Sequence, residues 1–417
     1  MKPTLHLFDE IGTVCTMQGA AEKKGRRVTK ADLGLIHDGA MVTDEGRLIW
    51  IGKAAELPNE LKPLRDHSKM CTRLKGRAVI PGLIECHTHL IYAGNRTTEF
   101  ERRLQGESYQ SIAASGGGIL ATVLATRAAN LDELIEMGQV RANRFLRQGV
   151  TTLEIKSGYG LTVDSELKIL RAAGNIKGPR IVRTFLGAHA IPKEALSADH
   201  YLDQLILEAF PMIKNEGLAE RVDIFIERGY FSVDQGRRYL RAARDLGFQL
   251  AVHADQLTSS GGAALAVELK AHSAEHLLQI DDQEINLLAA SDVTCVLLPT
   301  SDLYMDCQFP PARSLLDAGA RVAVATDMNP GTSPSQDLAL SGLLARLKMQ
   351  MSWPEVMAAY TVGAAHALGL EREIGSLTVG RVCDFCVIDG HLEELFLEAG
   401  RMPIRSVYRS GVEIPIS

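Results

Sequence analysis

Residues 78–90, AVIPGLIECHTHL, decide the fold, because they join an apolar, β-branched run to a pair of histidines, His87 and His89. The run is typical of a buried strand. Side chains two positions apart on a strand lie on the same face, so both imidazoles can point the same way. Two interpretations stay open at this point: two ligands of one metal ion, or a hydrogen-bonded structural pair.

Further runs of the same kind follow at intervals, and helical stretches separate them. Counting the first, eight runs occur: AVIPGLIECH (78–87), VTTLEIK (150–156), RIVRTFLGAH (180–189), RVDIFIE (221–227), FQLAVHA (248–254), LKAHSAEH (269–276), VTCVLLPT (293–300) and RVAVATD (321–327). Capping boxes at Asn130 and Ser232, and glycines at 149, 174 and 247, mark the expected helix ends. The alternation predicts parallel strands joined by helical crossovers.

The length of this region distinguishes two architectures. Eight strand-helix units between His87 and Asp327 match the roughly 250 residues of a closed (β/α)8 TIM barrel. An open, doubly wound sheet is the alternative, but it would carry a glycine-rich nucleotide turn after its first strand, which this sequence lacks. We therefore expect an α/β protein with a barrel over residues 77–372.

The two ends of the chain differ from the middle. LIHDGAMVTDEGRLIWIG (35–52) alternates around a turn at Glu45 and Gly46, and VYRSGVEI (407–414) does the same around Ser410 and Gly411. Both are typical of antiparallel hairpins. Because neither piece is large enough alone, we predict that residues 1–76 and 373–417 pair into a composite small β-sandwich domain.

Composition excludes several classes of protein. The formal net charge of -6 and the mixed signs along the helices offer no basic face to nucleic acid or to acidic lipid. We find neither a signal peptide nor an apolar run long enough for a membrane span, so we expect a cytoplasmic protein. Seven scattered cysteines fit a reducing compartment, and Cys383 with Cys386 on a strand would face opposite ways, which argues against a metal site there.

Other polar residues stand at the ends of the predicted strands, where barrel enzymes build their sites. His253 ends the fifth run and Asp327 the eighth, and we expect them to bind one metal ion with His87 and His89. Imidazole and carboxylate donors suit zinc or iron. His276, at the end of the sixth run, is the further catalytic candidate, whereas His272 is assigned to packing or to supporting the site.

A metal-bound water loses a proton near neutral pH, so hydrolysis is the expected reaction. Asp327 could accept the proton of the attacking water, and His276 could polarise the scissile carbonyl or shuttle a proton. The fourth run, RVDIFIE, supplies no lysine to bridge a second ion, so we expect a mononuclear site.

The order of these motifs resembles the amidohydrolase superfamily, with HxH on strand one, His on strands five and six, and Asp on strand eight. The sequence is most similar to the imidazolonepropionase family. This resemblance covers essentially the whole chain and depends on seven motifs in order: PGLIECHTHLIYAGNRTTEFERRLQG (81–106), EIKSGYGL (154–161), TFLGAHA (184–190), HADQL (253–257), SAEHL (273–277), ATDMNPGTSP (325–334) and GSLTVGRVCDF (375–385).

The resemblance implies hydrolytic ring opening of 4-imidazolone-5-propanoate to N-formimidoyl-L-glutamate, a reaction of histidine degradation, with one zinc or iron ion. It implies substrate or product contacts at Arg96, Tyr159, His189, Gln256, Asn329, Gly331 and Thr332. A propionate tail suits a guanidinium and a hydroxyl donor, which Arg96 and Tyr159 supply. Gln256 cannot be a general base, so Asp327 or His276 must serve.

Two alternatives remain at this point. A related aminohydrolase, such as a purine or pyrimidine deaminase, would release ammonia from another cyclic amide or amidine. A catalytically silent scaffold would retain the barrel without turnover, although such proteins usually lose metal ligands and this chain has all four. The expected partner is a small anionic substrate, and barrels with an added β domain often pair, so we also expect a homodimer.

Overall fold

The predicted barrel strands form one parallel sheet in sequence order. The computed structural model describes residues 5–107, 111 and 117–416. Within them the barrel sheet has eight strands: β6 (Leu83–Glu85), β7 (Val150–Lys156), β8 (Arg180–Ala188), β9 (Arg221–Ile226), β10 (Gln249–Ala254), β11 (Ser273–His276), β12 (Thr294–Leu297) and β13 (Arg321–Val324). Beyond β6 and β13, Thr88 forms a parallel bridge with Met328, and the His89 amide donates to the Met328 carbonyl at 2.9 Å. These contacts join the first and last strands, which excludes the open doubly wound sheet.

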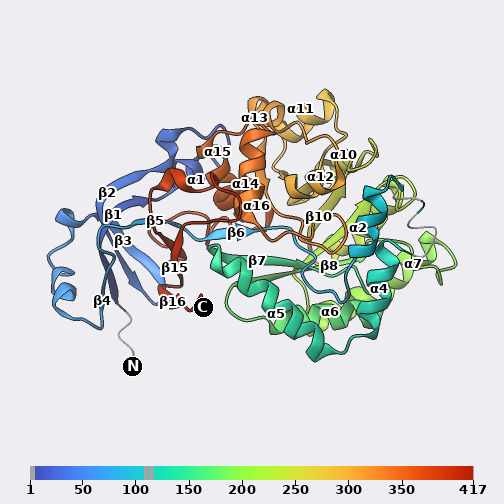
Figure 1. Ribbon diagram of the computed structural model, residues 1–417, viewed down its shortest axis with the longest axis horizontal. Coiled ribbons are helices and arrows are strands. Elements are labelled where there is room, and N and C mark those ends of the chain that lie inside the picture. The colour runs from blue at the N-terminus through green and yellow to red at the C-terminus, as the bar shows by residue number, and fades with distance from the viewer. Residues whose placement is uncertain (1–4, 108–110, 112–116, 417) are drawn as a thin grey trace.

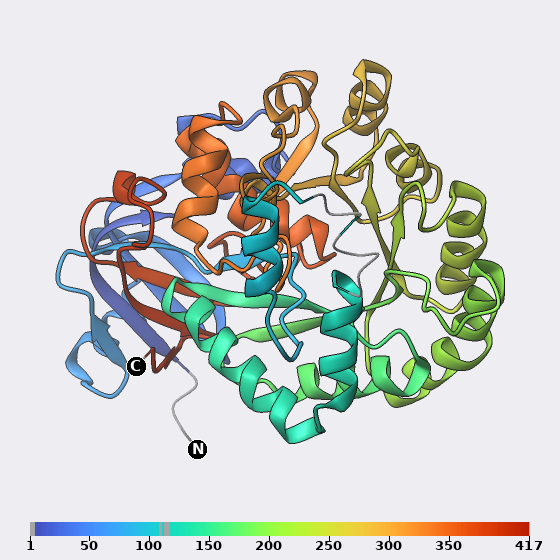
Figure 2. The ribbon, with the colours of Figure 1, turned by 45° about the vertical axis from the view of Figure 1, so that its right-hand side comes forward.

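Helices surround the barrel strands on the outside (Figure 2). The capping boxes predicted at Asn130 and Ser232 are present, and they begin the helices after β6 and β9. Gly174 does not end its helix, which continues to Asn175. The α-helices of the described residues are α1 (Gln18–Glu22), α2 (Thr97–Leu104), α4 (Ile119–Ala128), α5 (Leu131–Arg147), α6 (Val163–Asn175), α7 (Ala198–Gln204), α8 (Phe210–Glu216), α9 (Val233–Asp245), α10 (Gly262–Glu268), α11 (Asp282–Ala290), α12 (Pro299–Met305), α13 (Ala312–Ala318), α14 (Leu338–Leu347), α15 (Trp353–Ala358) and α16 (Ala364–Ala367).

Shorter helical turns complete several of these segments. The π-helical turns η4 and η5 continue α7 and α15 without a break, so each forms part of a longer helical segment. Their bounds, with those of the 3-10 turns, are η1 (Lys30–Leu33), η2 (Ala54–Glu56), η3 (Lys62–Asp66), η4 (Leu205–Ala209), η5 (Ala359–Gly363) and η6 (Leu392–Glu394).

The chain ends form a second sheet beside the barrel, at the left of Figure 1. Its strands are β1 (His6–Cys15), β2 (Leu35–Asp44), β3 (Arg47–Lys53), β4 (Cys71–Arg73), β5 (Ala78–Pro81), β14 (Phe385–Ile388), β15 (Ile404–Arg409) and β16 (Val412–Ile414). They pair in the order β16-β15-β14-β5-β1-β2-β3, and β4 pairs with one end of β1. N-terminal and C-terminal segments therefore share one mixed sheet, as expected.

Both hairpin turns lie where the sequence placed them. Glu45 and Gly46 have φ values of 47° and 78°, and Ser410 and Gly411 have 50° and 72°, so each turn has two residues with positive φ that match the strand twist. Phe8 of β1 packs against Phe385 of β14, with ring centroids 4.8 Å apart. Strands from the two ends of the chain, with only β5 between them in the sheet, thus share an apolar core. The division of the chain after residues 76 and 372 stays a prediction.

The first predicted strand run belongs to both sheets. Ala78–Pro81 pairs with β1 and β14 of the small sheet, whereas Leu83–Glu85 pairs with β7 of the barrel. Gly82 lies between them, and its amide donates to the Asp384 carbonyl at 2.9 Å. A Cβ at Gly82 would lie 2.2 Å from the Thr151 hydroxyl, so only glycine fits this junction. The prediction of one continuous barrel strand from 78 to 87 was therefore wrong.

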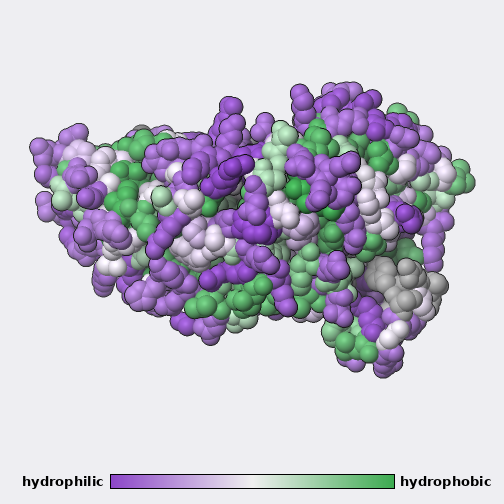
Figure 3. Space-filling view, turned by 90° about the horizontal axis from the view of Figure 1, so that it is seen from above, coloured by the Kyte–Doolittle hydropathy of each residue, from purple (hydrophilic) through white to green (hydrophobic). Residues whose placement is uncertain are grey.

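The surface and the cysteines carry less information. The face in Figure 3 mixes hydrophilic and hydrophobic residues. None of the helices in the described ranges combines the length and apolarity that a bilayer span requires. All seven cysteines have free thiols, and Cys383 and Cys386 are both buried beside the small sheet.

Candidate active site

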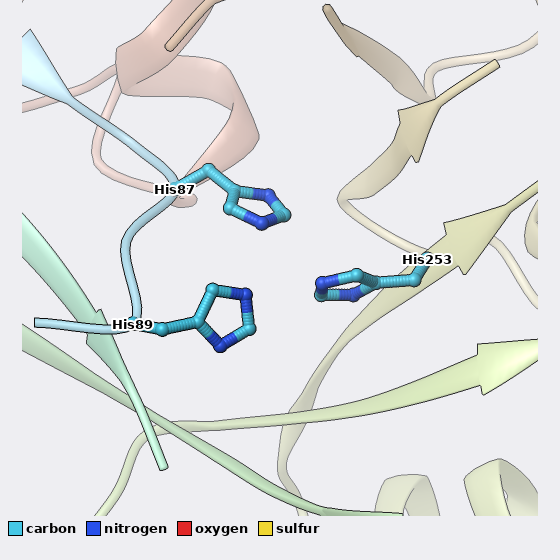
Figure 4. Close-up of side chains that lie close together, drawn as sticks. All are labelled: His87, His89 and His253. Atoms are coloured by element: carbon cyan, nitrogen blue, oxygen red, sulfur yellow. The ribbon is translucent and has the colours of Figure 1, made fainter. Parts of the chain in front are cut away.

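Five of the predicted residues gather at the carboxyl ends of the barrel strands. His87 and His89 follow β6, His253 lies on β10, His276 ends β11, and Asp327 follows β13. The rings of His87, His89 and His253 point toward a common space (Figure 4). His276 and Asp327 have positive φ values of 77° and 51°, an unfavourable backbone conformation for such residues that often accompanies functional sites.

The distances between these side chains are short. Asp327 Oδ1 lies 3.3 Å from His87 Nε2 and 3.5 Å from His89 Nε2. The ring centroids of His87 and His253 are 4.7 Å apart, and those of His253 and His276 are 5.2 Å apart. One nitrogen from each of His87, His89 and His253 can be chosen so that all three lie within 4.8 Å of one another. Likewise, one nitrogen from each of His87 and His276 and one carboxylate oxygen of Asp327 can be chosen so that all three lie within 4.8 Å of one another.

Several of these polar atoms are buried without a hydrogen-bond partner among the described residues. They include His87 Nε2, His253 Nε2 and Asp327 Oδ1. Buried polar groups without partners are costly, and a cation would satisfy nitrogen and carboxylate lone pairs together. The donor set of imidazole and carboxylate therefore fits a zinc or iron ion.

Two carboxylates lie behind the imidazoles, on the side away from the shared space. Glu275 Oε2 is 2.7 Å from His87 Nδ1, and Asp223 Oδ2 is 2.9 Å from His253 Nδ1. All four side chains are almost completely buried. Carboxylates in this position fix the tautomer of an imidazole and leave Nε2 available as a ligand.

A buried lysine links these carboxylates. Lys156 Nζ donates to Asp223 Oδ2 at 2.8 Å and also lies 3.0 Å from Glu154 Oε1 and Glu275 Oε2. Burial disfavours the ammonium, but the three carboxylates outweigh this effect and raise the pKa of Lys156. Conversely, His253 and Lys156 overcome the effect of burial and lower the pKa of Asp223. Attraction between opposite charges therefore holds the cluster together, with three carboxylates around one ammonium.

The protonation of the site follows from burial and from these neighbours. Burial holds the pKa values of His87 and His276 well below the usual range. The charge of Lys156 lowers the pKa of His87 further, and the charge of His253 does the same for His276. Burial opposes protonation of His253, but the Asp223 carboxylate raises its pKa. Burial raises the pKa of Asp327 to about 7. Neutral imidazoles at His87 and His276 are the form that binds a cation or donates a single N–H.

A cavity of about 490 Å³ is lined by four of the five site residues: His89, His253, His276 and Asp327. Tyr159 and His189 line it, and the His189 ring stacks on His89 at 5.0 Å. His189 Nδ1 lies 3.0 Å from the Gly158 carbonyl, and burial lowers the pKa of His189 to about 4. Gly158 has a φ of 119°, and a Cβ there would lie 2.8 Å from His189 Nδ1, so glycine is required.

Arg96 lines the same cavity and is held in place from behind. Its Nε donates to Glu99 Oε2 at 2.7 Å, and Glu99 Oε1 accepts the Gly118 amide. A Cβ at Gly331 would lie 2.0 Å from Arg96 Nη1. Gly331 itself does not line the cavity, and its lack of a side chain makes room for the guanidinium.

The loop after β13 is organised by Asn329. Its Oδ1 accepts the amides of Gly331 and Thr332 at 2.8 Å, and its Nδ2 donates to the Asp327 carbonyl at 2.7 Å. Asn329, Thr332 and Gln256 all line the cavity, and Gln256 Nε2 contacts Met305 Sδ at 3.7 Å. Every predicted contact residue except Gly331 therefore faces one space.

Comparison with known proteins places this site in a family. The model of the amidohydrolase family matches residues 78–414. An imidazolonepropionase of Bdellovibrio bacteriovorus is 52% identical over 411 residues, which cover 98% of this chain and 96% of that protein. An imidazolonepropionase of Bacillus velezensis is 42% identical over 91% of this chain and 90% of its own length. The chain belongs to the imidazolonepropionase family of amidohydrolases.

Solved structures agree with this fold at lower sequence identity. An adenosine deaminase from Xanthomonas campestris with bound zinc matches 98% of the chain and 92% of its own, with a TM-score of 0.70 and 18% identity. The guanine deaminase of E. coli matches 99% of each chain, with a TM-score of 0.71 and 16% identity. At these identities the likeness shows a shared fold alone.

The sequence interpretation of this imidazolonepropionase-family chain missed the charged cluster behind the histidines. Glu154 and Lys156 stand two positions apart in VTTLEIK, and Asp223 interrupts RVDIFIE. Charged residues inside such apolar runs were the available signal, since they must be paired when buried. The structure also places Arg228 at the cavity and His272 at the opposite end of β11, away from the predicted metal ligands.

Proposed function

We propose that the protein is a metal-dependent hydrolase that opens the ring of 4-imidazolone-5-propanoate to give N-formimidoyl-L-glutamate. The observation that carries this proposal is the convergence of unpartnered His87 Nε2, His253 Nε2 and Asp327 Oδ1 at the mouth of the barrel. The high identity to curated imidazolonepropionases over nearly the whole chain supports the choice of substrate.

Four side chains would hold one zinc or iron ion: His87, His89, His253 and Asp327. When bound, the ion lowers the pKa of a water molecule and so supplies a hydroxide nucleophile near neutral pH. Asp223 and Glu275 keep the imidazole Nε2 atoms aimed at the shared space, because each lies against the Nδ1 atom of a ligand histidine.

Asp327 and His276 are the proposed catalytic residues. Asp327 accepts the proton of the attacking water and delivers it to the ring nitrogen as the C–N bond breaks. His276 is buried and neutral, so it donates one N–H to the substrate carbonyl and stabilises the negative charge that develops there. Gln256 has no acidic proton to exchange and serves as a hydrogen-bonding contact.

The remaining cavity residues would position the anionic substrate. Arg96, held by Glu99, presents a guanidinium that matches a carboxylate, and Tyr159 adds a hydroxyl donor. His189, Gln256, Asn329 and Thr332 line the same cavity and would contact the substrate or the product, and Gly331 gives room to the Arg96 guanidinium. A neutral purine or pyrimidine would not need the guanidinium.

The test combines turnover with metal analysis. Purified protein should consume freshly generated 4-imidazolone-5-propanoate, and His253→Ala should lose both the metal and the activity. His200→Ala, which removes an exposed histidine of α7, is the matched control and should keep both. Full activity in a metal-free preparation would refute the proposal, and ammonia release from another ring would indicate a deaminase.

Two further expectations belong to this proposal. We propose that the enzyme works in the cytoplasm, because its substrate is a soluble intermediate of histidine degradation. We also propose a homodimer, which sedimentation velocity would test directly.

A further inference from the structure

A second cavity, of about 520 Å³, lies at the other end of the barrel. We call it the basal cavity and define it by Lys24, Lys270, His272, Arg321, Arg372 and Arg381. Arg321 begins β13, whereas Asp327 follows the end of that strand, and His272 precedes β11, whereas His276 ends it. The basal cavity and the metal site therefore lie at opposite ends of the same strands.

Cations dominate the walls of the basal cavity. Five lysine and arginine side chains line it, against two carboxylates, Asp292 and Glu371, among the residues that the structure describes. Arg321 is only 3% exposed and forms part of the floor. Lys24, Lys270 and Arg372 are exposed at the rim. Such an excess of one sign in a concave site raises the local concentration of counter-ions.

The guanidiniums of Arg321, which is buried, and Arg381, which is partly buried, are held by neutral oxygen atoms. Arg321 Nε donates to the Thr294 hydroxyl at 2.9 Å, and its Nη2 donates to the Asp292 carbonyl. Arg381 Nη1 donates to the Ile374 carbonyl at 2.7 Å. These bonds fix the guanidiniums in place. Among the described residues no carboxylate forms a close ion pair with either of them, although Asp292 and Glu371 act on Arg321 from a greater distance.

The rim cations are also uncompensated. Lys24, Lys270 and Arg372 form no ion pair with any residue in the described ranges, although ion pairs are frequent elsewhere on the surface. Glu371 lies 4.0 Å from His366 Nδ1, and its carboxylate offsets part of the positive charge of Arg321 and Arg381.

The positive charges of the basal cavity contribute to the pKa shifts of neighbouring groups. Burial lowers the pKa of Arg321 to about 10, and the nearby Arg26 guanidinium lowers it further. Burial lowers the pKa of His366 to about 3, with Arg321 and Lys24 acting in the same direction. His272 stays neutral for similar reasons, and its Nδ1 is buried with no hydrogen-bond partner among the described residues.

We propose that the basal cavity binds a small multivalent oxyanion, a phosphate or a carboxylate group carried by a small molecule. Its volume lies in the range of small-molecule sites. Lysine and arginine side chains match such anions through charge-assisted hydrogen bonds, whereas a metal ion would be repelled.

Calorimetric titration tests this proposal. The metal-loaded enzyme is titrated with inorganic phosphate and, separately, with succinate, at constant ionic strength. Binding of either probe at one site per chain is expected, and the two arms show whether the preferred group is phosphate or carboxylate. The double variant Lys24→Glu/Arg372→Glu should weaken that binding by at least about tenfold while turnover stays unchanged. Both side chains are exposed, so the variant should fold normally.

Arg228→Glu is the matched control, because Arg228 is an exposed arginine at the opposite, metal-site cavity. It should leave phosphate and succinate binding at the basal cavity unchanged. Two results would overturn the proposal: neither probe binds, or the double variant binds the probes as tightly as the wild type. Additional loss of binding in Arg228→Glu would place the anion at the metal-site cavity instead.

Discussion

Replacement of Asp223 by asparagine tests whether the carboxylates behind the histidines control metal binding. The change keeps the volume of the side chain and removes its charge. Asp223 Oδ2 lies 2.9 Å from His253 Nδ1 and 2.8 Å from Lys156 Nζ, and all three side chains are buried. We therefore expect two measurable effects, one on metal affinity and one on stability.

The size of each effect follows from these contacts. Loss of a carboxylate that orients a ligand imidazole typically weakens metal binding by about 10–100-fold. At an effective dielectric constant of about 20, the attraction between Lys156 and Asp223 is about 6 kcal/mol, and desolvation offsets part of it. Glu154 and Glu275 still neutralise the ammonium, so we expect a stability loss of about 3 kcal/mol, the lower end for a broken buried pair.

Zinc affinity is measured by competition with a chromophoric chelator, and stability by urea unfolding. Asp9→Asn is the matched control, because Asp9 is also a buried carboxylate with a basic partner, Arg65 at 2.7 Å, but lies in the small sheet. It should lose stability and keep its zinc affinity. Unchanged zinc affinity in Asp223→Asn would refute the role assigned to this carboxylate.

Three further predictions concern the cavity, the metal and the small sheet. Gly331→Ala should displace the Arg96 guanidinium, because the new Cβ would lie 2.0 Å from Nη1, and steady-state kinetics should show KM raised by about tenfold with kcat nearly unchanged. Chelation of the metal should lower the melting temperature, since an ion present at 100 times its Kd stabilises the fold by about 2.7 kcal/mol, and added zinc should restore it. Burial raises the pKa of Asp384 to about 6, above the unfolded value of about 3.9, so its contribution to stability is present below about pH 4 and lost as pH rises through 6. Urea unfolding should show the wild type losing about 2 kcal/mol between pH 4 and pH 8 relative to Asp384→Asn.

Much of the barrel could be predicted from the sequence, because its strands are buried on both faces and so appear as apolar, β-branched runs. Strand β7 (Val150–Lys156), for example, begins and ends at the same residues as the run VTTLEIK. The ends of the shorter strands could not be predicted in this way: β11 begins at Ser273, four residues after the apolar run starts at Leu269. Backbone pairing with neighbouring strands, which local composition does not encode, sets these limits.

The proposed metal ligands could be predicted as a group because each stands at the carboxyl end of a strand, and a closed barrel brings such ends together. The cluster of Glu154, Lys156, Asp223 and Glu275 behind them was not predicted. Whether Lys156 meets Asp223 or points to a helix depends on the tilt and register of the strands, and both are tertiary properties. His276 could be distinguished from His272 in the sequence because only His276 stands at the end of its run.

The junction at Gly82 has a consequence for protein engineering. One residue separates a strand that pairs with β14 from the strand that leads into His87, and its amide is bonded to Asp384 near the C-terminus. Exchange of the barrel between relatives would therefore require both chain ends to travel with it. A hybrid that combines a foreign C-terminal segment with this barrel would lose the anchor of its first strand. His87 and His89 would then be the first of the proposed site residues to lose their alignment.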